Sequence, residues 1–485
     1  MKRIFYLASI LAILACSPVT APTEDSDDIT EQPADTTVVN ESHSNGSSEE
    51  GVSDETSSGN ATDDLESETE IQPENGLDSE PEVDVNAYND YARVTLKSEV
   101  KNVLPMTGIV LWSESSNASS QKEYIQLEFA YMLYNQVCKE KDVYDWSPMD
   151  KLLAQVAARG HQLVVRFRYS YVGKQCAVPD YIKRWPGYEE TSGKSEGKTT
   201  YFPDWRCEEL QRFHLDFHKR FAERYDNDPR LAFVQTGFGL WAEYHIYDGP
   251  MVLGKTFPSK NFQATFFKEM DKYFENTTWS ISIDAADSYY SPLEAQPDLL
   301  KLRFGNFDDS FMHKTHNEYN RDCWIFFGLN RYKKAPCGGE FSYYSDYDQA
   351  HCLDKAGMYG RVFEDEVAKY HMTYIIGNDQ PGYQSMSRIK EASMSMGYKY
   401  EILDYRIKDN KAAVLIKNIG VAPIYRDAYV AIGSHTGSYS LAGLMPGKTA
   451  WVLIEGEGVN AAEKPRIVCD HLVSGQKIEY KADVK

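Results

Sequence analysis

Apolar and polar residues alternate along the chain in a way that predicts strands and helices in turn. Between residues 105 and 380, short apolar runs are followed by longer amphipathic stretches. Such a pattern is typical of buried parallel strands joined by crossover helices. Eight runs are candidate strands: GIVLW (108–112), IQLEFAYML (125–133), QLVVRFRY (162–169), LAFVQTGF (231–238), WSISIDA (279–285), KLRFGNF (301–307), CGGEFSY (337–343) and MTYIIG (372–377).

Amphipathic stretches between these runs predict helices over 147–160, 207–228, 262–275 and 348–370. The first of them starts with Ser-Pro and ends at a glycine, which are favoured residues at helix starts and stops. Eight strands alternating with helices predict an α/β fold, a (β/α)₈ barrel of the TIM type. We assign residues 87–395 to this barrel.

The pattern changes after residue 395. Short apolar runs are separated by turn residues such as Asp409-Asn410 and Pro446-Gly447, and no helical periodicity interrupts them. This arrangement predicts a small all-β sandwich domain over residues 396–485.

The N-terminus begins MKRIFYLASILAILAC, in which Lys2 and Arg3 precede an apolar run that is too short to span a bilayer. The run therefore predicts an export signal over residues 1–16. Its end, ILAC, resembles a bacterial lipobox, and this resemblance implies that Cys16 is lipidated. We expect a protein of the cell envelope, anchored by lipid to the outer membrane. An ordinary signal peptide with an incidental cysteine is the alternative.

Residues 17–86 form a segment of a different composition. They contain 21 acidic residues, no lysine or arginine and no aromatic residue. Such a segment cannot bury enough apolar area to fold, so it predicts a disordered acidic tether that favours display at the cell surface. The tether accounts for nearly all of the net charge of −22, which leaves the folded part close to neutral. Nothing indicates the basic face that a nucleic acid partner requires.

Seven cysteines follow Cys16, an odd number for a protein that is exported. Export permits disulfides, so we expect one or two bridges among loop cysteines, such as Cys176 with Cys207, and at least one free thiol. No CxxC pair or other zinc-type spacing occurs. We therefore expect neither a metal nor a cofactor.

Several segments resemble a known family when they are taken in order. VYDWSPMDKLLAQVAARGHQLVVRFRYS (143–170), RYDNDPRLAFVQTGFGLWAEYH (224–245) and GGEFSY (338–343) resemble the bacterial family catalogued as domain of unknown function 4832. The resemblance covers most of residues 105–480 and implies a barrel similar to those of glycoside hydrolases. The motif of the family near the fourth strand is closer to G-x-W-G-E-W-H. Here Ala242 replaces its second Gly and Tyr244 its second Trp, while Glu243 and His245 are kept.

Two glutamates occupy positions that resemble the catalytic pair of the large glycoside hydrolase clan. Glu243 follows the fourth predicted strand and Glu340 lies in the seventh. The resemblance implies that Glu243 is the acid/base and Glu340 the nucleophile of a two-carboxylate cleavage of a glycosidic bond. An apolar and aromatic surround would raise the pKa of Glu243, as the acid role requires. Ala242 stands where that clan often has an asparagine, and this departure weakens the implied mechanism.

Further side chains are candidates for binding a carbohydrate at the carboxyl ends of the strands. Arg166 and Arg168 end the third strand, and one is expected to point inward and the other outward. Aromatic rings are candidates for stacking on sugar rings. The proposed binding residues are Trp241, His245, Arg166, Arg168, Arg303, Asp308, His371, Asn378 and Tyr169.

Three functions are compatible with these residues. The first is a lipid-anchored glycoside hydrolase that acts on an extracytoplasmic oligo- or polysaccharide. The second is a glycan-binding lipoprotein without catalysis, which Ala242 favours. The third is a metal-dependent hydrolase that uses His245, His371 and a carboxylate, and it ranks last because no HxxxH or HxH pair lies near those positions.

Overall fold

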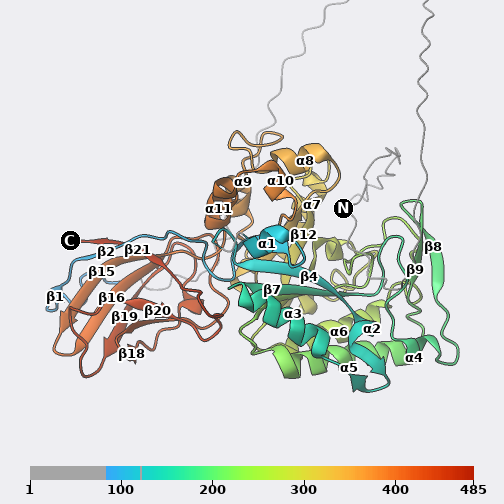
Figure 1. The fold of residues 1–485 in the computed structure, drawn as a ribbon, viewed down its shortest axis with the longest axis horizontal. Coiled ribbons are helices and arrows are strands. Elements are labelled where there is room, and N and C mark those ends of the chain that lie inside the picture. The colour runs from blue at the N-terminus through green and yellow to red at the C-terminus, as the bar shows by residue number, and fades with distance from the viewer. Residues whose placement is uncertain (1–82, 121–122) are drawn as a thin grey trace, which may run out of the picture. The chain divides into compact units, whose positions relative to one another are not determined.

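The computed structural model describes residues 83–120 and 123–485 (Figure 1). The expected signal segment with Cys16, and residues 17–82 of the expected tether, lie outside the described residues. Residues 83–485 form one compact unit.

Eight parallel strands close into a barrel, which confirms the predicted fold class. Each strand pairs in parallel with the next along the chain, and the last pairs with the first. The eight strands are β3 (Gly108–Trp112), β4 (Leu127–Leu133), β7 (Gln162–Arg168), β10 (Leu231–Gln235), β11 (Thr278–Ser282), β12 (Gly305–Phe311), β13 (Cys337–Phe341) and β14 (Met372–Ile376).

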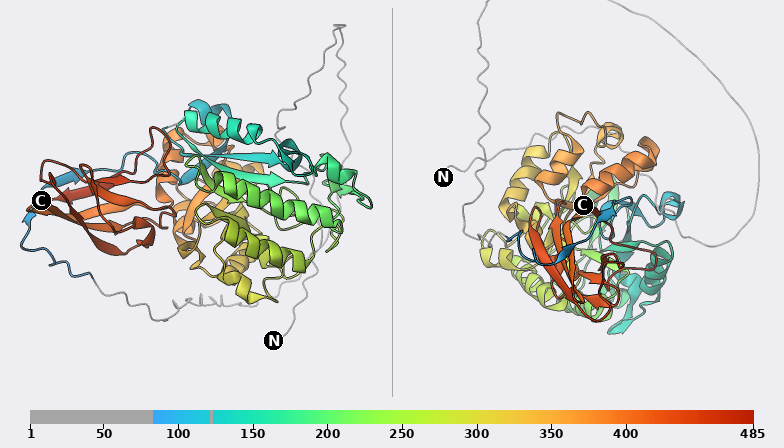
Figure 2. Two further views of the ribbon diagram at one scale, coloured as in Figure 1. Left: turned by 90° about the horizontal axis from the view of Figure 1, so that it is seen from below. Right: turned by 90° about the vertical axis from the view of Figure 1, so that its left-hand side faces the viewer.

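Helices surround the strands, as Figure 2 shows for the long green helix α5. They bury an apolar face against the barrel: Phe217 of α5, for example, lies 4.8 Å from Phe167 of β7 between ring centroids. Of the described helices, none is long and apolar enough to cross a bilayer. The longer helices are α3 (Ser147–Ala158), α5 (Glu208–Tyr225), α6 (Lys260–Tyr273), α7 (Asn317–Phe327), α9 (Phe363–Lys369) and α11 (Met386–Ser395).

Shorter elements complete the loops. The helix predicted over 348–370 is interrupted, since Gly357 and Gly360 adopt positive φ angles of 80° and 75° between α8 and α9. The short α-helices are α1 (Ser116–Ser120), α2 (Tyr134–Val137), α4 (Asp180–Lys183), α8 (Asp346–His351) and α10 (Gln380–Tyr383). The short 3₁₀ helices are η1 (Ile283–Ala286), η2 (Pro297–Lys301) and η3 (Arg331–Lys333). Two antiparallel strand pairs are β5 (Cys138–Glu140) with β6 (Val143–Tyr144) and β8 (Thr191–Ser195) with β9 (Lys198–Phe202).

Two further sheets follow the barrel in the chain. One contains β19 (Thr449–Glu455), β16 (Lys411–Asn418), β15 (Tyr400–Lys408), β21 (Tyr480–Val484), β2 (Leu96–Ser98) and β1 (Ala92–Arg93). The other contains β18 (His435–Thr436), β17 (Tyr429–Ile432) and β20 (Arg466–Val468), and a short 3₁₀ helix η4 (Leu441–Gly443) lies between β18 and β19.

The first two strands differ from the predicted boundaries. The sequence assigned residues 87–395 to the barrel, but β1 pairs with β15 and β2 pairs with β21 of the C-terminal sheet. Strands of two and three residues are too short to show a periodic pattern, so the sequence did not reveal them.

Apolar side chains fill the barrel interior at the amino ends of its strands. Leu127, Phe129, Val164, Phe233 and Tyr374 belong to a core that continues into the C-terminal sheets. A separate core lies between the outside of the strands and the helices. The interior at the carboxyl ends of the strands is left to polar residues.

The cysteines do not pair as expected. All seven described cysteines are free thiols, so the expected bridge between Cys176 and Cys207 is wrong. A disulfide requires a short distance between two Cα atoms, and spacing along the sequence does not carry that information.

Candidate active site

A tight loop after β10 holds Glu243 in place. The amides of Phe238 and Gly239 both donate to the carbonyl oxygen of Glu243, at 3.2 and 2.8 Å. A Cβ atom at Gly239 would lie 1.9 Å from the carbonyl oxygen of His245, so only glycine fits there. Trp241 and Ala242 adopt left-handed φ angles of 55° and 57°. Left-handed backbone at two successive non-glycine residues is strained and is typical of functional sites.

The side chain of Glu243 forms a buried ion pair with Arg166 of β7. Arg166 Nη1 lies 2.6 Å from Glu243 Oε1. The Nε and Nη2 atoms of Arg166 donate to Gln235 Oε1, at 2.9 and 2.7 Å. The guanidinium also lies 4.3 Å from the ring centroid of Phe307. These contacts fix Arg166 from several sides, and Arg166 in turn fixes one oxygen of Glu243.

Other carboxyl groups surround this pair. Glu340 lies on β13 and is partly exposed, Asp309 lies on β12, and Asp284 follows β11 directly. His245 Nε2 lies 3.6 Å from Asp309 Oδ2 and 3.8 Å from Glu243 Oε2. The carboxyl end of the barrel thus gathers four carboxyl groups, and Arg166 is the arginine that Glu243 contacts.

Burial and the repulsion between neighbouring charges raise the pKa values of Glu243, Asp309 and Glu340. Burial raises the pKa of Glu243 well above its usual range; Arg166 opposes the rise, while Asp309 and Glu340 add to it. Burial and the charge of Asp284 raise the pKa of Asp309 to about 7. Burial raises the pKa of Glu340 to about 7, against the charge of Arg166. Carboxyl groups that titrate near neutral pH are typical of catalytic sites.

Aromatic rings lie beside the carboxyl groups. Tyr247 stacks on Trp241 and on His245, with ring centroids 5.9 and 5.4 Å apart. Tyr171 meets the edge of Trp241 at 6.1 Å. Trp241 and Tyr247 therefore present amphipathic rings next to Glu243, in an arrangement suited to the apolar faces of sugars.

Several predicted residues meet at this site, namely Glu243, Glu340, Arg166, His245 and Trp241. Arg168 lies there too, because its guanidinium lies 5.8 Å from the ring of Tyr131, which Arg166 also contacts. The expectation that Arg166 and Arg168 point in opposite directions is wrong, since residues two apart in a strand share a face. Arg168 Nε is buried and makes no hydrogen bond within the described residues.

Asn378 and Trp112 lie where β14 and β3 end. Asn378 Oδ1 accepts a hydrogen bond from the amide of Trp112 at 3.1 Å, and its amide nitrogen donates to Asp379 at 3.1 Å. The indole Nε1 of Trp112 is buried without a hydrogen bond in the described part of the chain. Asn378 thus links the end of β14 to the end of β3.

Two predicted binding residues point out of the barrel. The ring of Tyr169 stacks on Tyr134 at 4.1 Å, and its hydroxyl hydrogen-bonds with His214 of α5 at 2.9 Å. Asp308 accepts hydrogen bonds from Asn320 and Trp324 of α7, at 2.8 and 3.2 Å. Both side chains anchor helices to strands, so their assignment to the binding site is wrong.

Two others lie at the opposite end of the barrel. Arg303 precedes β12, which begins four residues later than predicted, and its Nη2 donates to the carbonyl oxygen of Phe274 at 2.5 Å. His371 precedes β14, where Nδ1 lies 2.6 Å from the carbonyl oxygen of Val421 and the ring stacks on Tyr332 at 3.6 Å. Residues at the amino ends of strands cannot reach the site.

Three residues of the site, Asp284, Gln235 and Tyr131, were not predicted from the sequence. Asp284 ended a predicted strand, where a carboxyl group could have been noted. Gln235 and Tyr131 lie inside apolar runs, and only the parity of their positions relative to Phe233 and Phe129 indicates that they point inward.

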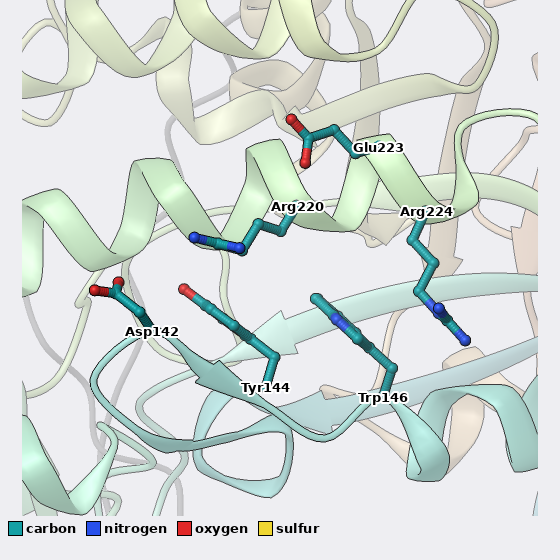
Figure 3. Close-up of a pocket in the computed structure, with 6 residues that line it drawn as sticks. All are labelled: Asp142, Tyr144, Trp146, Arg220, Glu223 and Arg224. Carbon is teal, nitrogen blue, oxygen red and sulfur yellow. The ribbon is translucent and has the colours of Figure 1, made fainter.

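A surface groove of about 440 Å³ lies elsewhere, on the helical side of the barrel (Figure 3). It is lined by Asp142, Tyr144, Trp146, Arg220, Glu223 and Arg224. Its charges are paired within the chain: Arg220 with Asp216 at 2.7 Å, and Arg224 with Asp150 at 2.7 Å. The aromatic rings pack on α5, so this groove shows no unsatisfied group that calls for a ligand.

No family model and no curated protein matches the sequence. Solved structures that resemble the chain include glycoside hydrolases. A trimodular GH5_4 endoglucanase matches 79% of this chain and 78% of its own, with 10% identity and a TM-score of 0.38. A GH5_18 protein from Bifidobacterium longum in complex with Manβ1-4GlcNAc matches 62% and 81%, with 8% identity and a TM-score of 0.39. A family 30 xylanase from Clostridium acetobutylicum matches 76% and 98%, with 9% identity and a TM-score of 0.34. At this similarity the reaction has to be argued from the residues of this chain.

Proposed function

We propose that the protein hydrolyses a glycosidic bond, with Glu243 as general acid/base and Glu340 as nucleophile. The observation that carries this proposal is that both carboxyl groups lie near one buried guanidinium at the carboxyl end of the barrel. Arg166 contacts Glu243 at 2.6 Å, and its charge also lowers the pKa of Glu340. Cleavage by two carboxyl groups requires one that is protonated and one that is ionised.

The surroundings of the two glutamates support this division of roles. Glu340 is partly exposed and has a pKa of about 7, whereas Glu243 is buried more deeply and its pKa is raised well above its usual range. Glu340 therefore ionises first and is available to attack the anomeric carbon. Glu243 keeps its proton and can assist the leaving oxygen.

The two oxygens of Glu243 have different neighbours. Oε1 is held by Arg166, while Oε2 faces His245 at 3.8 Å. The proton is therefore best placed on Oε2, from which it passes to the leaving oxygen. The carboxylate that remains is stabilised by Arg166, and it can then accept a proton from the water of the second step.

A carbohydrate is the substrate class that suits the rings beside the carboxyl groups. Trp241 and Tyr247 stack at 5.9 Å with an angle of 15° between their planes, so they offer a broad aromatic surface. With an exposed fraction of 50%, Tyr247 keeps part of its ring open to solvent. The C–H faces of a sugar pack well on such surfaces.

The N-terminal sequence supports a proposal about the place of action. We propose that Cys16 carries a lipid and that the chain acts on an extracytoplasmic oligo- or polysaccharide at the outer membrane. Labelling with a radioactive fatty acid in cells should mark the protein and not its Cys16→Ala variant. Protease added to intact cells should degrade a surface-exposed form, and complete protection would place it inside. Membership of the uncharacterised family that its motifs resemble stays a prediction.

A glycan-binding protein without catalysis is the second candidate. Ala242, in left-handed backbone next to Glu243, stands where the glycoside hydrolase clan often has an asparagine. The hydrogen bond that such a side chain gives to the sugar is therefore missing from this position. Binding of a glycan without any turnover would favour this candidate.

The test is a screen of the mature protein against a panel of polysaccharides, with release of reducing ends as the readout. Glu243→Gln and Glu340→Gln should each lower the rate about 10²–10⁴-fold, which is the range for loss of an acid, base or nucleophile. Glu294→Gln, an exposed glutamate, serves as the control with the same change of charge. Equal rates in all variants would overturn the two-carboxylate mechanism.

A further inference from the structure

The carboxyl end of the barrel holds more negative charge than its own residues neutralise. Asp309 and Glu340 lie near Arg166, but that guanidinium is already taken by Glu243 and Gln235. The ring of His245 stays beyond hydrogen-bond distance, at 3.6 Å from Asp309 Oδ2. A ligand that brings a positive charge would supply what these carboxyl groups lack.

Asp284 is the strongest sign of such a ligand. Its exposed fraction is 7%, and Oδ2 is buried without a hydrogen bond to any described residue. Asp284 also raises the pKa of Asp309 more than any other charge does, which indicates that the two carboxyl groups are neighbours. A buried carboxylate oxygen without a hydrogen bond is costly, so native structures seldom keep one unless a ligand uses it.

We propose that Asp284 and Asp309 bind the ammonium group of an amino sugar, so that the substrate is a glycan with free amines. This inference rests on the proposed function, because it names the substrate of the same site. An ammonium group carries three donors, and the carboxylate oxygens of Asp284 and Asp309 offer acceptors for them. Glu243 keeps its hydrogen bond from Arg166 and its role as acid. A glycan with carboxylate or sulfate groups would be repelled by the same charges.

A divalent cation is the alternative ligand of this cluster. Glu243, His245 and Asp309 offer ligand atoms that lie within 4.8 Å of one another. Two features oppose it. Arg166 holds the carboxyl group of Glu243 at 2.6 Å, and its positive charge would repel a metal ion. His245 Nδ1 is buried without a hydrogen bond among the described residues, whereas a metal-bound histidine normally donates its second ring N–H to a partner.

The experiment measures binding by the Glu340→Gln variant, so that hydrolysis does not consume the ligand. Chitosan oligosaccharides carry free amines, and chitin oligosaccharides of the same length carry acetylated ones. Isothermal titration should show chitosan binding at least about tenfold more tightly, as expected for a charge-assisted hydrogen bond in a buried site. Adding Asp284→Asn or Asp309→Asn should weaken chitosan binding about tenfold more than chitin binding. Glu294→Gln is the matched control, since it removes an exposed charge from the same loop.

Other outcomes overturn the proposal. Equal or tighter binding of chitin, no binding of chitosan, or an unchanged preference in both aspartate variants would each contradict it. Titration with Ca²⁺, Mn²⁺ and Zn²⁺ forms a second arm. Binding of one of them that is lost in His245→Ala and Asp309→Asn would make the cluster a metal site instead.

The proposed function fails in a different way. Suppose that the wild-type protein binds chitosan tightly but releases no reducing ends from it or from any other glycan. This result would support the ammonium site and contradict the proposed hydrolysis. Cleavage of neutral glycans alone would support the proposed hydrolysis and contradict the ammonium site.

Discussion

Arg166 and Glu243 form a buried ion pair, with 2.6 Å between Nη1 and Oε1, along the inside of the barrel. The pair joins the third barrel strand to the loop after the fourth. Oε1 of Glu243 is held by Arg166, and Oε2 is left available for proton transfer.

Arg166→Gln should therefore destabilise the protein strongly, because it leaves the carboxyl group of Glu243 buried without a cation. We expect the free energy of unfolding to fall by about 3–5 kcal/mol, measured by chemical denaturation. Arg220→Gln breaks the more exposed pair with Asp216 and should cost about 0–1 kcal/mol. Equal losses in the two variants would mean that the buried pair contributes no more than a surface pair.

Gly239→Ala should disturb the loop that carries Glu243, because the added Cβ would lie 1.9 Å from the carbonyl oxygen of His245. We expect a loss of about 1–3 kcal/mol in stability together with a loss of hydrolysis. Gly382→Ala is the control, since an added Cβ there meets no atom within 4 Å. A fully active Gly239→Ala variant would show that the loop does not need this close approach.

The rate of hydrolysis should depend on pH in a bell shape. Glu340 must be ionised to attack, so kcat/KM should rise with pH through about 7, the pKa of this carboxyl group. At higher pH the rate should fall as Glu243 loses its proton. Asp379→Asn should move the rising limb to lower pH, because the charge of Asp379 raises the pKa of Glu340. A rising limb near pH 4.5 would contradict the assignment of Glu340.

The stability of the protein should also depend on the titration of Asp309. Its pKa is about 7 in the folded protein, against a usual value of 3.8, so ionisation in the folded state is unfavourable. The stability that protonation provides is present below about pH 4 and is lost as the pH rises through 7. Asp309→Asn should thus raise the free energy of unfolding on the order of 2–4 kcal/mol at pH 8, and by much less at pH 4. A gain of equal size at both pH values would point to packing instead.

Hydrolysis should retain the configuration at the anomeric carbon, since a nucleophile and an acid/base act in two steps. Proton NMR of the first product formed should show the anomer of the substrate. Glu340→Gly should regain activity with azide, which replaces the missing carboxylate and gives a glycosyl azide. Inversion in the NMR experiment would remove the nucleophilic role of Glu340.

The barrel could be predicted from the sequence because each of its eight strands is a separate apolar run with a helix or a long loop after it. The register of single strands could not be predicted as well. The sixth strand begins at Gly305 and not at residue 301, and this shift moved Arg303 to the far end of the barrel. Tyr169 and Asp308 were wrongly assigned to the binding site, because their side chains point outward to helices.

The site could be predicted only in part for a related reason. Glu243 and Glu340 stood out because a carboxyl group in a buried run is unusual. Asp284 and Gln235 did not, since their significance comes from contacts across strands that lie far apart in the chain. Partners such as Gln235 for Arg166 are a property of the closed barrel, and a linear pattern does not contain them.

The pairing of β2 with β21 places Leu96 opposite Val484, so a strand that precedes the barrel lies beside the last described strand. The sheet that receives β2 cannot be complete until β21 has been synthesised. Folding of this part must therefore close a loop that spans nearly the whole chain, and contacts of such long range form slowly. Until β21 pairs with it, the edge of β15 is open, and this edge is where we expect the incomplete sheet to aggregate first.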